Sequence, residues 1–249
     1  MTHMSGDTDN HKAGDLLIPS NNWGNITSVE TGVVEERFLE IKNKIAPCKP
    51  RIIGVTKYFG VDAIVNGYKA GLRNFGESRA NDAVAKIELL PTEVRKNSEF
   101  HFIGHLQTNK AEKVVQNFDY IQSVDSLKLA KVISQIACRL NKREKILLQV
   151  NVSGEEQKYG FEPEDLIQEM AELIQLGGIE VKGLMCMAPF GADEKELRSI
   201  FGKLRELRDA MSEKFGIELP ELSMGMSDDY HIAVEEGATM IRIGRKLFK

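Results

Sequence analysis

One lysine of this 249-residue chain stands where a short apolar run ends. The run Arg51-Ile-Ile-Gly-Val-Thr56 is typical of a buried strand, and Lys57 follows it directly. Most lysines are solvated surface residues, and Lys57 considered alone fits that description. An amine held between apolar walls, however, can lose its proton and form a Schiff base with an aldehyde. Its position therefore makes Lys57 a candidate nucleophile.

Two glycine-containing segments in the last 30 residues have the residue types of an anion-binding site. The first is Leu222-Ser-Met-Gly-Met-Ser-Asp-Asp229, and the second is Ile241-Arg-Ile-Gly-Arg245. Glycine lets the backbone approach a phosphate closely, and the N–H groups at a helix start can point toward it. Ser223 and Gly244 suit that role. The same segments are also consistent with ordinary tight turns, in which a residue such as Ser227 caps a helix.

Arg242 alternates with Ile241 and Ile243, so its side chain is expected on the opposite face of a strand from theirs. In a closed barrel that face is the interior or the mouth, where a guanidinium needs an acceptor. A ligand heteroatom is one candidate, and a salt bridge to a carboxylate such as Glu77 is the other. The pattern does not separate the two.

His101 and His105 are four residues apart, which on a helix would be metal-ligand spacing. The strand-like run before Gly104 argues against a helix, so a metal site is not expected. His105 is placed at the end of a strand, where it would line the mouth of a barrel. Asn74 is assigned the matching place after the preceding strand. Either residue can equally be a structural hydrogen-bonding group.

Eight short apolar runs separated by longer amphipathic segments organise the chain after Pro50. Three of the intervening segments, 129–140, 166–174 and 197–207, repeat apolar residues at helical spacing. The pattern predicts an α/β fold, a single (β/α)₈ TIM barrel, with an extra amphipathic N-terminal helix over 26–45. Chemistry in such a barrel belongs at the carboxyl ends of the strands. The predicted strands are 51–56, 72–76, 100–104, 120–124, 146–152, 180–185, 221–224 and 240–243.

Local signals agree with these elements. Ser126 and Asp193 are placed as helix N-caps, and Glu196 completes a capping-box pattern with Asp193. Gly71 and Gly216 stand just past helical stretches, as helix-ending glycines do. No G-x-G-x-x-G fingerprint is present, which disfavours an open dinucleotide-binding sheet.

The amino-acid composition limits the possible fold size and partners of the chain. With 42% hydrophobic and 28% charged residues, the chain can bury a sizeable core. Residues 1–24 are polar and are predicted to form a poorly ordered tail, and residues 25–249 to form the barrel domain. The net charge of −4 is spread along the chain, so neither nucleic acid nor a membrane surface is an expected partner. We expect a cytoplasmic protein and a monomer, although no pattern fixes the oligomeric state.

The three cysteines lie far apart in the sequence, which is typical of free thiols. Cys186 lies in an apolar segment and is expected to be buried.

Several motifs, taken in order along the chain, carry a resemblance. They are Gly54-Val-Thr-Lys57, Asn74-Phe-Gly-Glu77, His101-Phe-Ile-Gly-His-Leu-Gln107, Gly183-Leu-Met185, the segment 222–229, and Met240-Ile-Arg-Ile-Gly244. Over residues 26–249 the chain resembles the YggS/PROSC family of proteins that bind pyridoxal 5′-phosphate (PLP). The resemblance implies a barrel similar to the N-terminal domain of alanine racemase, fold type III of the PLP proteins.

The resemblance also implies roles for individual residues. Lys57 would hold PLP as a Schiff base, Arg242 would face the pyridine nitrogen, and Ser223 with the Gly244 and Arg245 backbone would hold the phosphate. Asn74 and His105 complete the predicted cofactor-binding set. Position 245 departs from the family pattern, which often has a small hydroxyl residue there. A backbone contact would survive that change, whereas a hydroxyl contact would have to be replaced by the guanidinium.

The function implied is PLP homeostasis without a turnover reaction, with apo PLP-dependent enzymes as recipients. Fold type III enzymes complete their site with a β-rich second domain, and no such segment is expected after the eighth strand. The alternative is a minimal amino-acid racemase that uses Lys57 as its base, with Tyr58 or Tyr159 acting on the other face of the substrate carbon. A third hypothesis is that a protein partner senses PLP occupancy.

Overall fold

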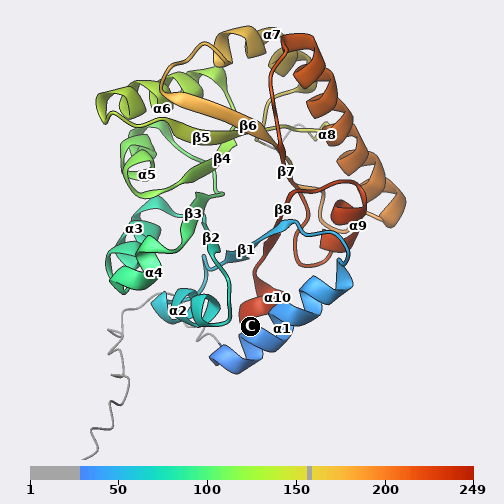
Figure 1. The fold of residues 1–249 in the computed structure, drawn as a ribbon. Helices are drawn as coiled ribbons and strands as arrows, with labels where there is room; N and C mark the ends of the chain where they lie inside the picture. Colours follow the sequence, from blue (N-terminus) through green and yellow to red (C-terminus); the bar gives the residue numbers. More distant parts are fainter. Residues whose placement is uncertain (1–28, 156–158) are drawn as a thin grey trace, which may run out of the picture.

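Eight parallel strands close into one barrel in the computed structural model, which describes residues 29–155 and 159–249 (Figure 1). Each strand pairs with the next along the chain, and β8 pairs with β1 to close the ring. The predicted TIM barrel is therefore confirmed, while the predicted tail over 1–24 lies outside the described residues. The strands are β1 Arg51–Val55, β2 Asn74–Glu77, β3 Glu99–Phe102, β4 Tyr120–Val124, β5 Glu144–Gln149, β6 Ile179–Met185, β7 Glu221–Ser223 and β8 Met240–Ile243.

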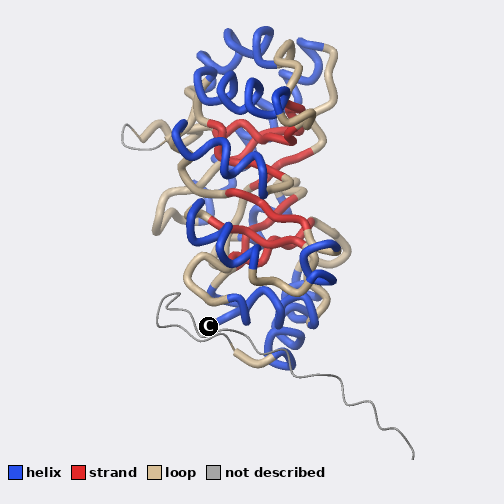
Figure 2. Tube along the Cα trace, turned by 90° about the vertical axis from the view of Figure 1, so that its left-hand side faces the viewer, coloured by secondary structure: helices blue, strands red, loops and turns tan. Residues whose placement is uncertain are grey.

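Helices surround the strands on all sides, as the tube view shows (Figure 2). The predicted N-terminal helix is present as α1 (Thr31–Lys44), which packs against α2 and the last helix, α10. The barrel helices are α2 Val61–Lys69, α3 Ala80–Glu88, α4 Thr92–Lys96, α5 Ala111–Asn117, α6 Leu127–Arg139, α7 Pro163–Leu173, α8 Glu194–Phe215, α9 Tyr230–Glu235 and α10 Arg245–Phe248, with a 3₁₀ turn, η1, at Thr108–Lys110. Within the described chain, no helix is long and apolar enough to cross a bilayer.

The predicted helix ends are present. The Ser126 hydroxyl accepts a hydrogen bond from the Leu129 N–H at 3.3 Å, which caps α6. The Asp193 carboxylate accepts from the Glu196 N–H at 2.8 Å and caps α8. Helix α8 ends at Gly216 in the left-handed region, at φ 62°. Cys186 is buried, as expected.

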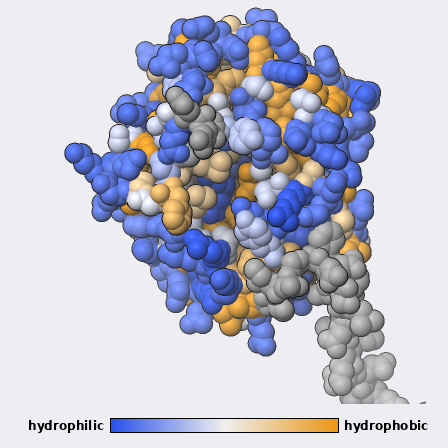
Figure 3. All heavy atoms as spheres, turned by 180° about the vertical axis from the view of Figure 1, so that it is seen from behind, coloured by the Kyte–Doolittle hydropathy of each residue, from blue (hydrophilic) through white to orange (hydrophobic). Residues whose placement is uncertain are grey.

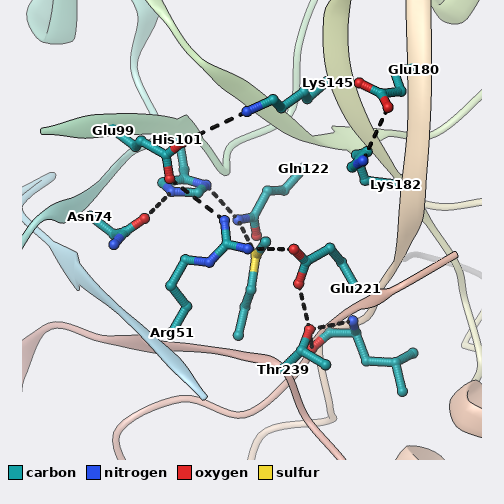
Figure 4. A network of polar contacts seen from close by, with 12 residues as sticks. Arg51, Asn74, Glu99, His101, Gln122, Lys145, Glu180, Lys182, Glu221 and Thr239 are labelled. Carbon is teal, nitrogen blue, oxygen red and sulfur yellow. Dashed lines mark hydrogen bonds and ion pairs between the residues drawn. The ribbon is translucent and has the colours of Figure 1, made fainter. Parts of the chain in front are cut away.

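Two hydrophobic cores flank the barrel wall. The larger fills the space between strands and helices, and the smaller lies inside the barrel, formed by Ile53, Tyr120, Leu147, Met185 and Met240. At the end of the barrel where the strands begin, three ion pairs join interior-facing charges of different strands, and a fourth joins Lys182 to Glu180 within β6 (Figure 4). We call these six side chains the charged ring; they are Arg51, Glu99, Lys145, Glu180, Lys182 and Glu221.

Glu144, the first residue of β5, gives the fold a testable pH dependence. Its side chain is fully buried, and burial raises its pKa to about 7, although the Lys142 ammonium 2.7 Å away acts in the opposite direction. The folded state therefore binds this proton more tightly than the unfolded chain. The resulting stability is fully present below about pH 4.5 and is lost as the pH rises through 7.

We expect Glu144→Gln to reduce the loss of stability between pH 5 and pH 8, by at most about 3 kcal/mol. Urea unfolding at both pH values measures this change. Glu213→Gln, which alters an exposed carboxylate of α8, is the matched control. Equal pH dependence in the wild type and Glu144→Gln would contradict the assignment.

Candidate functional site

A cavity of about 340 Å³ opens where the strands end, on the side of the barrel opposite to the charged ring. In Figure 1 the barrel is seen from the end where the strands begin, and Figure 3 shows the opposite face, which is hollowed near its centre. Residues that follow five of the eight strands line the cavity, with Val55 and Arg242 from the strands themselves. The others are Lys57, Tyr58, Phe59, Ile103, Met187, Phe190, Met226, Ser227, Asp228, Gly244, Arg245 and Lys249.

The strand period carries Lys57 into this cavity. Side chains alternate along β1, so Arg51, Ile53 and Val55 face the barrel interior and Lys57 continues the series at the mouth. The ammonium lies 5.0 Å from the centroid of the Tyr58 ring. Lys57 is half-buried, which leaves its amine accessible from the cavity.

A buried ion pair fixes the backbone directly before Lys57. The Lys86 ammonium donates to the Glu77 carboxylate at 2.8 Å and to the carbonyl of Thr56 at 2.9 Å. The Thr56 hydroxyl donates to the same carboxylate at 2.7 Å. Glu77 is therefore not the partner of Arg242, which corrects that alternative: β2 turns Glu77 outward to helix α3.

Arg242 is a buried cation in the lining of the cavity. Its guanidinium donates to the Ser223 hydroxyl at 2.6 Å and to the carbonyl of Cys186 at 2.8 Å, and only 4% of the residue is exposed. Burial lowers the pKa of Arg242, and among the described residues no carboxylate forms an ion pair with it. Its charge is thus available to a group in the cavity.

The loops after β7 and β8 form another part of the wall. Gly225 has φ 87°, and a Cβ there would lie 2.5 Å from the Cβ of Ala233, so only glycine fits this turn. A Cβ on Gly244 would lie 3.3 Å from the carbonyl oxygen of Val55, so at this point the cavity wall is formed by the backbones of β1 and β8 packed closely together. At the rim, the guanidinium of Arg245 donates to the Asp228 carboxylate at 2.9 Å, with both side chains exposed.

The structure brings four of the seven predicted site residues together and places three elsewhere. Lys57, Arg242, Gly244 and Arg245 line the cavity. Ser223, fully buried in the barrel, uses its hydroxyl to accept from Arg242 and to donate to Gln122.

Asn74 and His105 also lie away from the cavity lining. The placement of Asn74 after the second strand is wrong, because it is the first residue of β2 and is hydrogen-bonded to His101 inside the barrel at 3.0 Å. His105 is exposed, lies 3.1 Å from the carboxylate of Asp125, and stacks on the Tyr159 ring with centroids 3.9 Å apart.

Sequence reasoning gave Ser227 only a helix-capping role. It lines the cavity, two residues past the Gly225 turn and close to Gly244 in the same wall. The second serine of the Ser-Met-Gly-Met-Ser run was the available signal, because a positive-φ turn redirects the residues that follow it. Met187 and Phe190, from the loop after β6, carried no chemical signal.

Comparison with known proteins identifies the family. Residues 29–249 match the family described as the alanine racemase N-terminal domain. A pyridoxal phosphate homeostasis protein of Synechocystis is 42% identical over 202 residues, which cover 81% of this chain and 92% of that protein. The chain belongs to this family. The resemblance drawn from the motifs is confirmed.

A second curated relative and two solved structures are also similar to this chain. The one from Aquifex aeolicus is 39% identical, covering 80% of this chain and 86% of that protein. PipY of Synechococcus elongatus, solved with PLP bound, has a TM-score of 0.79 at 37% identity, with 87% of this chain and all of that chain covered. An alanine racemase of Clostridium difficile shares the fold, with a TM-score of 0.73 at 17% identity over 90% of this chain and 62% of that one.

Removing the Lys86 ammonium tests the support beneath Lys57. In Lys86→Met the Glu77 carboxylate stays buried without its cation, so we expect a loss of about 3–5 kcal/mol in unfolding free energy. Adding Glu77→Gln should restore part of that loss, because no buried charge remains. Urea unfolding of the three proteins gives the numbers. Lys131→Met, which breaks the exposed pair with Glu172, serves as the control, and a similar small effect in both single variants would refute the role.

Proposed function

We propose that this chain holds PLP as a Schiff base on Lys57 and serves intracellular PLP homeostasis without a turnover reaction of its own. One observation carries the proposal: the amine of Lys57 and the buried guanidinium of Arg242 line the same cavity. The names of the relatives and the PLP-bound PipY structure support the choice of ligand.

The residues of the cavity fit the three functional ends of PLP. Lys57 offers a primary amine for the aldehyde, and Arg242 offers N–H donors for the ring nitrogen. Ser227 and the backbone at Gly244 and Arg245 offer donors for the phosphate. The size of the cavity lies within the range of small-molecule sites.

PLP supplies an aldehyde that condenses with an amine and a ring that withdraws electrons. With PLP bound, the Lys57 amine would be the group that condenses with this aldehyde, with loss of one water. Arg242 is a permanent cation, so its proximity disfavours protonation of the ring nitrogen and weakens the ring as an electron sink. Such an environment favours retention of the cofactor over carbanion chemistry.

Arg245 can keep the phosphate contact in spite of its departure from the family pattern. Backbone donors at positions 244 and 245 do not depend on the side chain. Within residues 29–155 and 159–249 the ion-pair partner of this guanidinium is Asp228 at the exposed rim, and an exposed pair of this kind is weak. It can therefore turn toward a phosphate at little cost.

No specific observation favours the racemase alternative. Racemisation needs an acid or base on each face of the substrate carbon. Tyr58 lies next to the Lys57 ammonium, on the same strand end. Tyr159 stacks on His105 and is not part of the cavity lining.

Replacement of Lys57 tests the covalent attachment. Wild-type protein mixed with PLP should absorb near about 420 nm, and borohydride should fix one PLP on the peptide that contains Lys57. Lys57→Ala should lose the absorbance band and that adduct, whereas the surface variant Lys131→Ala should retain both. Absorbance spectra and peptide mass mapping provide the readout. A wild-type protein that takes up no PLP would refute the proposed ligand.

An exposed apolar rim surrounds the cavity and suits transfer to a recipient protein. Phe190 is fully exposed, and Tyr58, Met187 and Met226 are each more than a third exposed. Exposed apolar side chains gathered at one site mark contact surfaces. We propose that apo PLP enzymes dock there and that the carrier itself is a monomer.

Phe190→Ser tests docking separately from binding. We expect PLP uptake to be unchanged, because Phe190 contributes no polar group to the cavity, and reactivation of an apo PLP enzyme by the loaded protein to slow severalfold. The matched control is Leu39→Ser, another exposed apolar residue, on α1. Reactivation no faster than the release of free PLP from wild-type protein would rule out direct transfer.

A further inference from the structure

A continuous chain of five side chains crosses the barrel interior from Arg242 to β2. Arg242 donates to the Ser223 hydroxyl at 2.6 Å, and Ser223 donates to the Gln122 amide oxygen at 2.7 Å. The Gln122 amide nitrogen lies 3.0 Å from His101 Nδ1, and His101 Nε2 lies 3.0 Å from the Asn74 amide oxygen. Figure 4 shows His101 between Asn74 and Gln122.

The donors and acceptors along this series of side chains match when every hydrogen bond runs from Arg242 toward Asn74. A guanidinium has no acceptor, so the Ser223 oxygen must accept from Arg242 and send its own hydrogen to Gln122. The amide nitrogen of Gln122 must then donate to His101 Nδ1. His101 must consequently be neutral, with its hydrogen on Nε2, because Asn74 presents an oxygen to that nitrogen.

The surroundings of His101 keep it neutral. It is completely buried, and burial together with the positive charges of Arg51 and Lys145 lowers its pKa to about 3. Its ring stacks on Tyr120, with centroids 5.0 Å apart. The charged groups that face this region come from five strands and are Arg51 of β1, Glu99 of β3, Lys145 of β5, Glu180 and Lys182 of β6 and Glu221 of β7 (Figure 4).

We propose that Ser223, Gln122, His101 and Asn74 act as a positioning relay that fixes the guanidinium of Arg242 toward the cofactor's ring nitrogen. This inference rests on the proposed function. The relay is polarised toward Asn74, so every member presents a lone pair toward Arg242, and the guanidinium is anchored through one of its N–H groups. None of the four positioning residues lines the cavity itself.

The relay explains why an arginine can be held there without a carboxylate. A carboxylate would neutralise the guanidinium and offer it a competing acceptor. A serine hydroxyl oriented by Gln122 is a neutral acceptor, which anchors one N–H group without forming an ion pair. Losing that anchor should let the guanidinium reorient and weaken its contact with the ring.

The state of His101 is measurable in cofactor-free protein. The chain has five histidines, so ¹⁵N-edited NMR of the imidazoles, assigned with His101→Asn, resolves the tautomer. We expect His101 to remain the neutral Nε2–H form between about pH 5 and 8. In Gln122→Met, where Nδ1 loses its donor, that single form should give way to a mixture. Titration of His101 in the wild type within this range would overturn the relay.

The effect on the cofactor is measured by titrating each variant with PLP and following absorbance. Ser223→Ala and Gln122→Met should raise the apparent Kd about tenfold, equivalent to about 1.4 kcal/mol, while at saturation the adduct still forms on Lys57. Ser134→Ala, which removes a buried hydroxyl bonded to the Gly178 N–H in the outer helix layer, should leave it unchanged.

A double-mutant cycle separates positioning from general stability. In an Arg242→Met background, Ser223→Ala should change the Kd less than about twofold, because the group that the relay orients is gone. An equal tenfold loss in that background would overturn the relay. So would wild-type-like affinity of Ser223→Ala and Gln122→Met. A wild type that binds no PLP would instead refute the proposed function, and the NMR measurement would still decide the relay.

Discussion

The burial of the Arg242 guanidinium, which forms no ion pair within the described residues, is the constraint on which the rest of the interior depends. A buried charge is tolerated only where hydrogen bonds replace its hydration. Arg242 donates to a backbone carbonyl and to a serine hydroxyl, both neutral acceptors, so hydrogen bonds rather than an ion pair replace its hydration. The need to supply and orient that hydroxyl draws polar side chains into a space that branched aliphatic residues usually fill in such barrels.

The strand period distributes these roles along the barrel axis. On β1 the interior positions are Arg51 in the charged ring, Ile53 in the small apolar core and Lys57 at the mouth. The residues between them face the helices, where Thr56 joins the buried pair that supports the backbone before Lys57. One alternating segment thus contributes to the charged ring, the core and the site. The charged ring also helps keep His101 neutral, which links the two ends of the barrel electrostatically.

The sequence was sufficient for the architecture because strands and helices carry local periods. Two of the eight predicted strands have the observed bounds, and the other six differ by at most three residues at either end. The caps at Ser126 and Asp193 follow from side-chain chemistry alone. The site was harder. The predicted second strand began at Leu72, two residues before the first pairing of β2 with β1, so Asn74 was expected nearer the mouth than the first position of β2 that it occupies.

Ser223 shows a different limit. Its partner Gln122 is 101 positions away, and no local pattern indicates that the hydroxyl is already engaged. From the sequence, a serine beside a glycine turn is a good candidate for phosphate binding. Only the closed barrel shows that Ser223 points inward, toward Gln122 of β4 and Arg242 of β8. Ser227 lies after the turn and keeps its place in the cavity wall. Residue type predicted the chemistry of this wall, while tertiary closure decided which serine could supply it.

The mouth and the floor of the cavity differ in a way that bears on the proposed function. Arg242, on the floor of the cavity, belongs to β8 and is hydrogen-bonded to Cys186, directly after β6, and to Ser223 of β7. Contacts from two neighbouring strands therefore fix its position. The rim consists of loop residues with exposed apolar side chains, of which Phe190 is fully exposed. A fixed floor favours retention of a planar ring, and an open rim leaves the outer edge of that ring accessible to a second protein. An enzyme that stabilises a carbanion needs the opposite arrangement, with water excluded from the reacting carbon. Firm contacts below and exposure above are the arrangement that the proposed carrier role requires.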